Sequence, residues 1–118
     1  MKKYYYLSTC TTCERIITEL GEVLDGFEKQ EIKTEPMTPE QVDQMEELSG
    51  SYEALFSKKA RKFRSRGLND MELLEHDYKR LINEEYTFLK RPVFIVDDQI
   101  FIGNSKKELD RLKAALAE

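Results

Sequence analysis

The sequence predicts an α/β fold in which a strand–helix–strand unit, a helical block and a strand–strand–helix unit follow one another along 118 residues. Three patterns support this order. A tyrosine-rich stretch near the N-terminus ends in a polar turn, and an apolar helix face follows it. Helix-capping signals recur in the middle of the chain. Two short apolar runs precede the last amphipathic segment. The composition, 40% hydrophobic and 36% charged, is typical of one globular domain.

The first unit begins with a predicted strand over residues 3–7, which is rich in tyrosine. Residues 8–12 follow with several side chains of the helix-capping type, and Gly21 marks the expected helix end. Residues 27–33 form a weaker strand candidate. Between the two strands, three apolar residues recur at helical spacing and define a buried helix face: Ile16, Ile17 and Leu20.

The helical block opens at Thr38, where Pro39 suits the first helical position and Gln41 completes a capping box. Gly50 closes this helix. Its apolar stripe consists of Val42, Met45 and Leu48.

The chain after Gly50 is predicted to continue as shorter helices. Residues 51–67 are basic, with a set of aromatic and aliphatic anchors: Tyr52, Leu55, Phe56 and Phe63. Asn69 is predicted to cap a further helix, with Glu72 three positions later. The buried stripe of that helix is expected to comprise Met71, Leu74, Tyr78, Leu81 and Ile82.

The C-terminal part is predicted to form a β-hairpin, in which an acidic turn, Asp97-Asp98, joins residues 93–96 to residues 100–102. A capping box at residues 105–108 begins the last helix, whose inner face holds Leu109, Leu112 and Leu116. A parallel βαβ unit joined to an antiparallel ββα unit is the thioredoxin plan. We therefore expect a thioredoxin-like fold with a mixed four-stranded sheet flanked by helices, as one domain over residues 1–118 with a helical insertion at about 38–83.

The charge and the N-terminus limit the classes of function. The formal net charge of −4, from 19 basic and 23 acidic residues, argues against broad nucleic-acid binding, which relies on neutralising phosphates. The apolar stretch at the N-terminus is too short for a signal-peptide core, and no run approaches the ~20 apolar residues of a membrane helix. We therefore expect a cytoplasmic protein, where a cysteine pair is more often catalytic or redox-sensing than structural.

Both cysteines of the chain fall within four residues, as Cys10-Thr11-Thr12-Cys13, between the first strand and the first helix. One helical turn brings sulfurs at this spacing close enough to bridge. A thiolate at a helix N-terminus faces unpaired backbone N–H groups and the positive end of the helix dipole, which lower a cysteine pKa from about 8.5 to roughly 3.5–7.5 in such motifs. We predict that Cys10 is the exposed nucleophile and that Cys13 resolves a mixed disulfide.

Two other interpretations of the pair stay open: two helix cysteines that never meet, and a zinc site. A structural zinc site needs four ligands, yet the chain has no second CxxC motif and His76 is its only histidine. His76 lies between Glu75 and Asp77, where a solvated side chain is the simpler interpretation. The strand-before, helix-after context favours a redox pair, and we expect no metal and no bound cofactor.

Four segments together resemble the arsenate reductase (ArsC) family and, within it, the Spx-type redox regulators. They are Ser8-Thr9-Cys10-Thr11-Thr12-Cys13, Arg80-Leu81-Ile82-Asn83-Glu84, Arg91-Pro92-Val93-Phe94-Ile95-Val96, and Ile102-Gly103 leading into Glu108-Leu109. Their order and spacing carry the resemblance, which covers nearly the whole chain. It implies a thioredoxin-like fold with a helical insertion.

The resemblance also implies roles for individual residues. Cys10 is the redox-active cysteine, Pro92 is cis and close to the sulfurs, and Arg91 presents a cation to a bound anion or to the thiolate; a solvated charge beside a strand is the alternative for Arg91. A thiol reductant such as glutathione, glutaredoxin or thioredoxin acts as co-substrate. The residues that the resemblance places around a bound anion are Thr11, Thr12, Arg15, Lys58 and Pro92.

Three departures from the glutathione-linked arsenate reductases bear on the substrate. Those enzymes carry arginines close after the cysteine motif, in the insertion and near the last strand. In this chain Glu14 follows the motif, and the other two arginine positions fall near Ser57 and near Gly103. A tetrahedral oxyanion is held best by several forked guanidinium donors, so the sequence predicts poor arsenate reduction. The CxxC motif and the glycine are closer to Spx-type proteins, in which the pair forms a redox-sensing disulfide.

The sequence leaves three functions open. The first is a small, arsenate reductase-like oxidoreductase, and the second is a regulator whose disulfide alters binding to another protein, such as the transcription machinery. The third is a scaffold without redox chemistry. The basic run at residues 58–66 is either a docking surface for an anionic partner or the solvated face of an amphipathic helix.

Overall fold

The computed structural model describes residues 1–117, and its chain divides into two compact units. One unit consists of Met1–Glu35 together with the C-terminal residues from Arg91 onwards, and the other is Pro36–Lys90. The first unit holds the sheet, the helix that carries Cys13 and the last helix of the chain. The second holds the helical insertion that the sequence predicts at 38–83.

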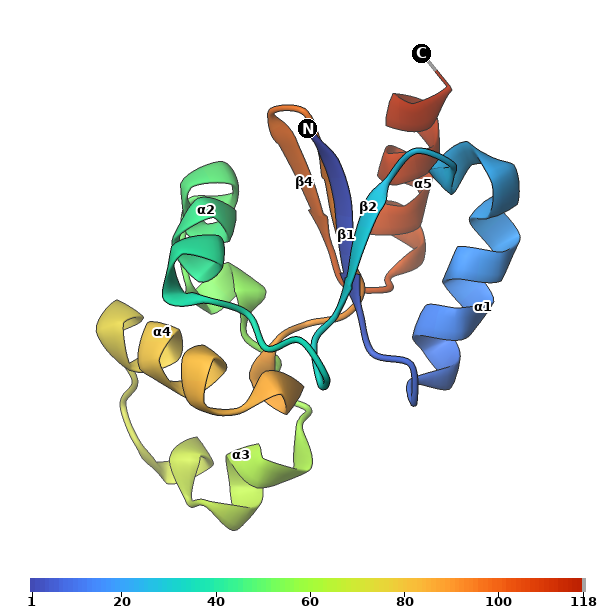
Figure 1. Cartoon of the computed structure of the whole chain (residues 1–118). Helices are drawn as coiled ribbons and strands as arrows, with labels where there is room; N and C mark the ends of the chain where they lie inside the picture. The colour runs from blue at the N-terminus through green and yellow to red at the C-terminus, as the bar shows by residue number, and fades with distance from the viewer. Residues whose placement is uncertain (118) are drawn as a thin grey trace. The chain divides into compact units, whose positions relative to one another are not determined.

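The sheet of the first unit has four strands in the order β2-β1-β3-β4 (Figure 1). Its strands are β1 (Lys2–Tyr6), β2 (Glu28–Glu31), β3 (Val93–Val96) and β4 (Gln99–Ile102). β1 runs parallel to β2 and antiparallel to β3, and β3 and β4 form a hairpin. Asp97 begins the two-residue turn with φ 57°, a conformation that Asn and Asp tolerate better than most residues. The predicted mixed sheet and acidic hairpin are both confirmed.

Two helices, α1 (Thr11–Leu20) and α5 (Lys106–Leu116), lie on the same face of this sheet (Figure 1). Of the apolar side chains predicted for their inner faces, Ile16 and Leu112 are buried, at 1% and 0% exposed. The others are partly buried against the same core: Ile17, Leu20, Leu109 and Leu116. Together with strand residues they form a core of Tyr4, Ile16, Leu24, Phe94, Val96, Phe101 and Leu112. The packing of α1 onto this core fixes the helix whose first turn carries the cysteines.

The start of α5 departs in one detail from the predicted capping box. The Ser105 hydroxyl accepts the Glu108 backbone N–H at 3.1 Å, as expected. The Glu108 carboxylate, however, accepts the N–H of Ile102 at 2.8 Å instead of returning to Ser105. Glu108 therefore ties the last residue of β4 to the helix that follows it.

The second unit is mainly helical, with α2 (Pro39–Ser49), α3 (Arg61–Ser65) and α4 (Glu75–Glu84) accompanied by three short 3₁₀ turns. Its turns are Glu53–Leu55, Leu68–Asp70 and Tyr86–Phe88. The predicted capping box at Thr38 and Gln41 is present, with both hydrogen bonds at 3.0–3.1 Å. Phe56 is the centre of an aromatic cluster, and its ring centroid lies 4.9 Å from that of Tyr78 and 5.0 Å from that of Phe88.

The predicted start of α4 is wrong. Asn69 lies in a 3₁₀ turn, and the helix begins at Glu75, because the Asp77 carboxylate accepts the Leu74 N–H at 2.9 Å and so caps the helix. The chain before this cap is extended at Met71, which removes Met71 from the helical face. Met71 and Leu74 are 58% and 54% exposed, so the buried stripe begins at Tyr78.

The core position Leu112 provides a test of this packing. Leu112→Ala removes a fully buried side chain, and we expect it to lower the free energy of unfolding by about 2–5 kcal/mol in urea denaturation. Leu116→Ala, on the same helix but at a partly buried position, is the control and should cost clearly less. Equal losses for the two variants would contradict the core assigned to α5.

Candidate functional site

The cysteine motif lies where the chain passes from β1 into α1. The N–H of Cys10 donates to the carbonyl of Leu7 at 3.0 Å, which closes a tight turn directly after the strand. Cys10 then occupies the N-cap position of α1 with extended backbone angles, φ −92° and ψ 110°, and its carbonyl accepts the N–H of Glu14 at 3.1 Å. The first sulfur is thus at the head of the helix, as predicted, where backbone N–H groups are free of intrahelical partners.

The two sulfurs differ in exposure and are in contact. Cys10 is half-buried, whereas Cys13, one turn into the helix, is 0% exposed. Both are free thiols in this structure, and the Cys13 thiol hydrogen-bonds to the Cys10 sulfur. An accessible sulfur backed by a buried one is the arrangement that a nucleophile and its resolving partner require.

The surroundings of Cys10 favour its thiolate. Partial burial alone would raise the pKa of Cys10, but several groups outweigh it and lower the pKa below its ordinary value. They are, in order, the backbone N–H of Cys13, the Cys13 thiol, and the Arg91 guanidinium through both its charge and a hydrogen bond. Cys10 is therefore the more acidic of the two thiols.

The surroundings of Cys13 favour its protonated thiol. Burial raises the pKa of Cys13 well above its ordinary value, and the hydrogen bond to Cys10 and the negative charge on Cys10 raise it further. The backbone N–H of Leu7 and the charge of Arg91 act in the other direction without offsetting these effects. Of the two thiols, Cys10 is thus the one that ionises more readily, and the buried sulfur holds its proton more tightly.

Arg91 and Pro92 stand at the start of β3, and the peptide bond between them is cis. The Arg91 side chain is half-buried and acts on both sulfurs, so the structure brings Cys10, Cys13 and Arg91 together. The carbonyl of Pro92 accepts the N–H of Gly103 at 2.9 Å. That contact joins the segment after β4 to the proline.

The remaining predicted anion-binding residues are placed in two different parts of the molecule. Thr11, Thr12 and Arg15 belong to the first turns of α1, where Thr11 and Arg15 are exposed and Thr12 is half-buried. Lys58 belongs to the second unit, where its ammonium group lies 2.9 Å from the Glu53 carboxylate. The hydrogen bond to Glu53 raises the pKa of Lys58. Its role toward an anion stays a prediction.

The sequence analysis did not identify Glu31 as a site residue. Glu31 is the last residue of β2, and its carboxylate accepts the backbone N–H of Ser8, two residues before Cys10, at 2.8 Å. A signal for this contact is present in the predicted βαβ unit, because the carboxyl ends of parallel neighbouring strands meet at one edge of a sheet. An acidic residue at the end of the second strand therefore lies beside the loop that follows the first.

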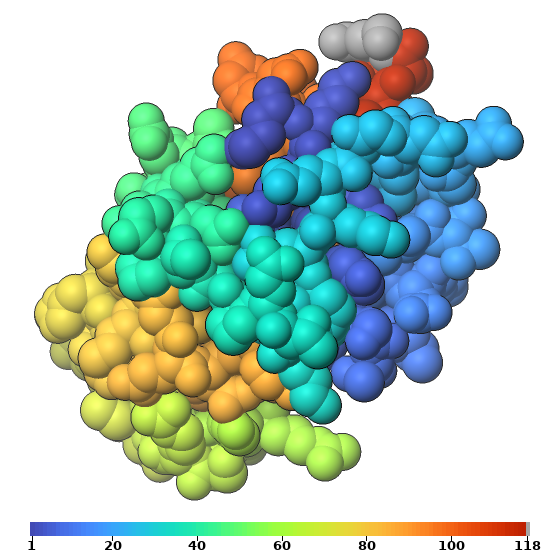
Figure 2. Space-filling model, viewed as in Figure 1, coloured from blue at the N-terminus to red at the C-terminus, as the bar shows by residue number. Residues whose placement is uncertain are grey.

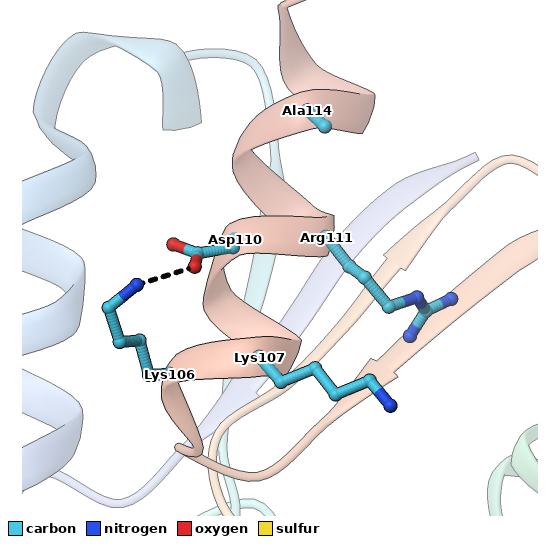
Figure 3. A pocket seen from close by; sticks show the side chains of 5 residues that line it. All are labelled: Lys106, Lys107, Asp110, Arg111 and Ala114. Carbon is cyan, nitrogen blue, oxygen red and sulfur yellow. Dashed lines mark hydrogen bonds and ion pairs between the residues drawn. The ribbon is translucent and has the colours of Figure 1, made fainter.

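A shallow hollow on α5 is separate from the cysteine site (Figure 3). It is lined by Lys106, Lys107, Asp110, Arg111 and Ala114. Two of its cations already have partners, since Lys106 lies 2.9 Å from the Asp110 carboxylate and Arg111 stacks over the Phe101 ring at 4.8 Å. Neither cysteine lines this hollow.

Residues 1–117, which the structure describes, contain neither a metal-binding cluster nor a membrane-spanning helix. No three His, Cys, Asp or Glu side chains among them cluster closely enough to hold a metal ion. Their helices are all too short or too polar to span a lipid bilayer.

A mixed four-stranded sheet, a CxxC motif at the head of the first helix and a cis proline at the start of the third strand together define a thioredoxin-like fold with a dithiol site. The profile of the ArsC family matches residues 5–112. The chain therefore belongs to the ArsC family, as the sequence motifs indicate.

Individual relatives agree with this assignment. The global transcriptional regulator Spx of Bacillus subtilis (strain 168) is 25% identical over 112 residues, which cover 94% of this chain and 86% of Spx. The solved structure of the YffB protein superposes with a TM-score of 0.83 at 20% identity, covering 98% of this chain and 99% of that one. A possible arsenate reductase from Streptococcus mutans UA159 gives a TM-score of 0.72 at 25% identity, covering 93% and 98%.

The contact between Arg91 and Cys10 leads to a prediction about reactivity. Because the Arg91 charge favours the Cys10 thiolate, Arg91→Gln should raise the pKa of Cys10 and slow its alkylation by iodoacetamide at pH 6 by about three- to tenfold. The pH profile of the alkylation rate measures this shift. Arg64→Gln, an exposed arginine of α3, is the control and should leave the profile unchanged. An unchanged profile for Arg91→Gln would exclude Arg91 from the site.

Proposed function

We propose that this protein is a thiol–disulfide oxidoreductase whose working pair is Cys10 and Cys13. The observation that carries the proposal is the asymmetry of the pair. A half-exposed sulfur with a lowered pKa is in hydrogen-bond contact with a fully buried sulfur whose pKa is raised. Two such thiols side by side are suited to transfer two electrons to a substrate without a bound cofactor.

In the first step the Cys10 thiolate attacks one sulfur of a disulfide substrate. The new Cys10–substrate S–S bond forms as the substrate S–S bond breaks, and the departing substrate thiolate takes a proton from solvent. Arg91, beside the reacting sulfur, stabilises the thiolate before the attack. The product of this step is a mixed disulfide on Cys10.

In the second step Cys13 resolves that mixed disulfide. Once Cys10 is bonded to the substrate it carries no charge, so two of the effects that hold the proton on Cys13 disappear. Burial still opposes ionisation, while Arg91 and the Leu7 N–H favour it. Cys13 then attacks the Cys10 sulfur, and the Cys10–Cys13 bond forms as the Cys10–substrate S–S bond breaks. The second half of the substrate leaves as a thiolate and takes up the proton that Cys13 has lost.

The cycle ends with a Cys10–Cys13 disulfide and a substrate reduced by two electrons. An external thiol reductant of the glutathione, glutaredoxin or thioredoxin kind then returns two electrons and restores the dithiol. We place this chemistry in the cytoplasm, where such reductants keep thiols reduced.

The charges near the motif favour a disulfide over arsenate as the substrate. Glu14 is exposed on the first turn of α1 and repels an oxyanion. Arsenate reduction needs several cations around a tetrahedral anion. A disulfide is uncharged and needs no such set of cations.

A redox-sensing regulator that binds a protein partner is the second candidate, and two curated relatives favour it. Both are named global transcriptional regulator Spx, from Bacillus subtilis and from Lactiplantibacillus plantarum, at 25% and 22% identity. In this role the Cys10–Cys13 disulfide removes the negative charge at the head of α1 and so changes the surface offered to a partner from the transcription machinery.

The enzymatic proposal predicts distinct behaviour for the two serine variants. With a coupled thiol reductant and a disulfide substrate, Cys10→Ser should abolish turnover, because the nucleophile is lost. Cys13→Ser should instead accumulate a mixed disulfide on Cys10, which mass spectrometry detects as an adduct.

After mild peroxide treatment the wild-type chain should contain a reversible Cys10–Cys13 bond. Full turnover by Cys10→Ser would rule out the proposed nucleophile.

The regulatory candidate is tested by capture of partners from a cytoplasmic extract with the reduced and the oxidised protein. A transcription protein bound in one redox state and released in the other supports a switch, and Cys13→Ser should then lose the difference. Retention of the same partner in both states counts against regulation by this disulfide.

A further inference from the structure

Glu31 reaches the cysteine loop because of the way in which the parallel strands end. Tyr6, the last residue of β1, is in register with Glu31, the last residue of β2. The ladder extends one hydrogen bond further, from the N–H of Ile32 to the carbonyl of Tyr6 at 3.0 Å. The side chain of Glu31 is therefore held at the level where β1 gives way to the loop before Cys10.

One oxygen of the Glu31 carboxylate is fixed by the turn that follows β2. Its Oε1 accepts the N–H of Lys33 at 2.9 Å, the N–H of Thr34 at 2.8 Å and the Thr34 hydroxyl at 3.1 Å. Figure 2 shows the segment after β2 at the surface of the molecule, and Lys33 and Thr34 are both exposed. The orientation of the carboxylate is thus set by its own strand end, independently of the cysteines.

The other oxygen, Oε2, acts on the cysteine loop. It accepts the N–H of Ser8 at 2.8 Å. This N–H and the carbonyl of Leu7 belong to the same planar peptide unit, and that carbonyl accepts the N–H of Cys10 at 3.0 Å. In addition, the N–H of Leu7 hydrogen-bonds to the Cys13 sulfur. A rotation of the Leu7–Ser8 peptide would therefore disturb the backbone at Cys10 together with the contact at Ser8.

We propose that Glu31 is a positioning residue for the redox site, in which its carboxylate locks the Leu7–Ser8 peptide plane and so holds Cys10 at the head of α1. The inference deepens the proposed function, since it names a residue outside the CxxC motif that sets the reactivity of Cys10. Glu31 does not touch the sulfurs; it acts through the backbone.

The ionisation of Glu31 agrees with this role. Desolvation opposes the charged form, but the hydrogen bonds from Ser8, Thr34 and Lys33 outweigh it and lower the pKa of Glu31 to about 2. The carboxylate is therefore ionised at pH 6, where the alkylation of Cys10 is measured, and keeps both oxygens as acceptors. A carboxamide at this position has only one acceptor oxygen and cannot serve Ser8 and the Lys33–Thr34 turn together.

A direct test uses the wild-type protein and does not depend on redox activity. Backbone amide signals are followed by NMR while the pH is lowered from 6 to 3. The amides of Ser8, Lys33 and Thr34 should show no inflection near the ordinary glutamate value of about 4.3, because Glu31 stays ionised. Slow hydrogen exchange at Ser8 is expected as well. An inflection near that value at Ser8, or fast exchange there, would overturn the proposal.

A second test uses Glu31→Gln with Glu28→Gln as the matched control, which makes the same change three residues earlier on the same strand. Glu28 is exposed and pairs with Lys3 at 3.8 Å. If Glu31 acts by position, Glu31→Gln should raise the pKa of Cys10 and slow its alkylation at pH 6 by about threefold or more. The control should leave the rate unchanged.

The direction in which the alkylation rate changes distinguishes a positioning role of Glu31 from a direct effect of its negative charge on Cys10. Loss of a nearby negative charge would favour the Cys10 thiolate and speed alkylation, so a faster or unchanged rate in Glu31→Gln would overturn the positioning role. The alkylation of Cys10 can be measured even if the protein never turns over a substrate. Failure of the proposed function would appear separately, as a wild-type chain that forms no Cys10–Cys13 disulfide under peroxide.

Discussion

The whole site depends on the passage from β1 to α1, which the chain completes within four residues, from Leu7 to Cys10. A strand buried in a sheet and a helix packed on the face of that sheet leave little freedom to the loop between them. The turn closed by Cys10 and Leu7 places one sulfur at the N-cap and the other one helical turn later. The contact between the two sulfurs and the difference in their exposure follow from this placement.

The two thiols become different because their surroundings differ. Cys13 is enclosed by the protein and loses the solvation that a thiolate needs, whereas Cys10 keeps access to solvent and gains hydrogen bonds. Arg91 adds a positive charge that both sulfurs experience. The result is an accessible, more acidic thiol and a buried thiol that holds its proton more tightly, one helical turn apart and in hydrogen-bond contact.

Membership of the ArsC family does not by itself decide between catalyst and regulator, because the same dithiol supports both roles. The distinguishing features lie around the motif. An acidic residue, Glu14, follows it directly and is exposed on the first turn of α1. Such surroundings suit a sulfur substrate or a sensing disulfide better than a tetrahedral oxyanion.

Strong local signals were enough to predict three features: the Thr38–Gln41 capping box, the Asp97-Asp98 turn, and a CxxC motif between a strand and a helix. Prediction from the sequence failed where local signals competed, and the Asp77 cap, not Asn69, sets the start of α4. Only the tertiary structure decided that Arg91 lies beside the sulfurs and that Glu31 reaches Ser8. These residues are some 80 and 23 positions from the atoms they act on, and only the pairing of β1 with β3 and β2 brings them close.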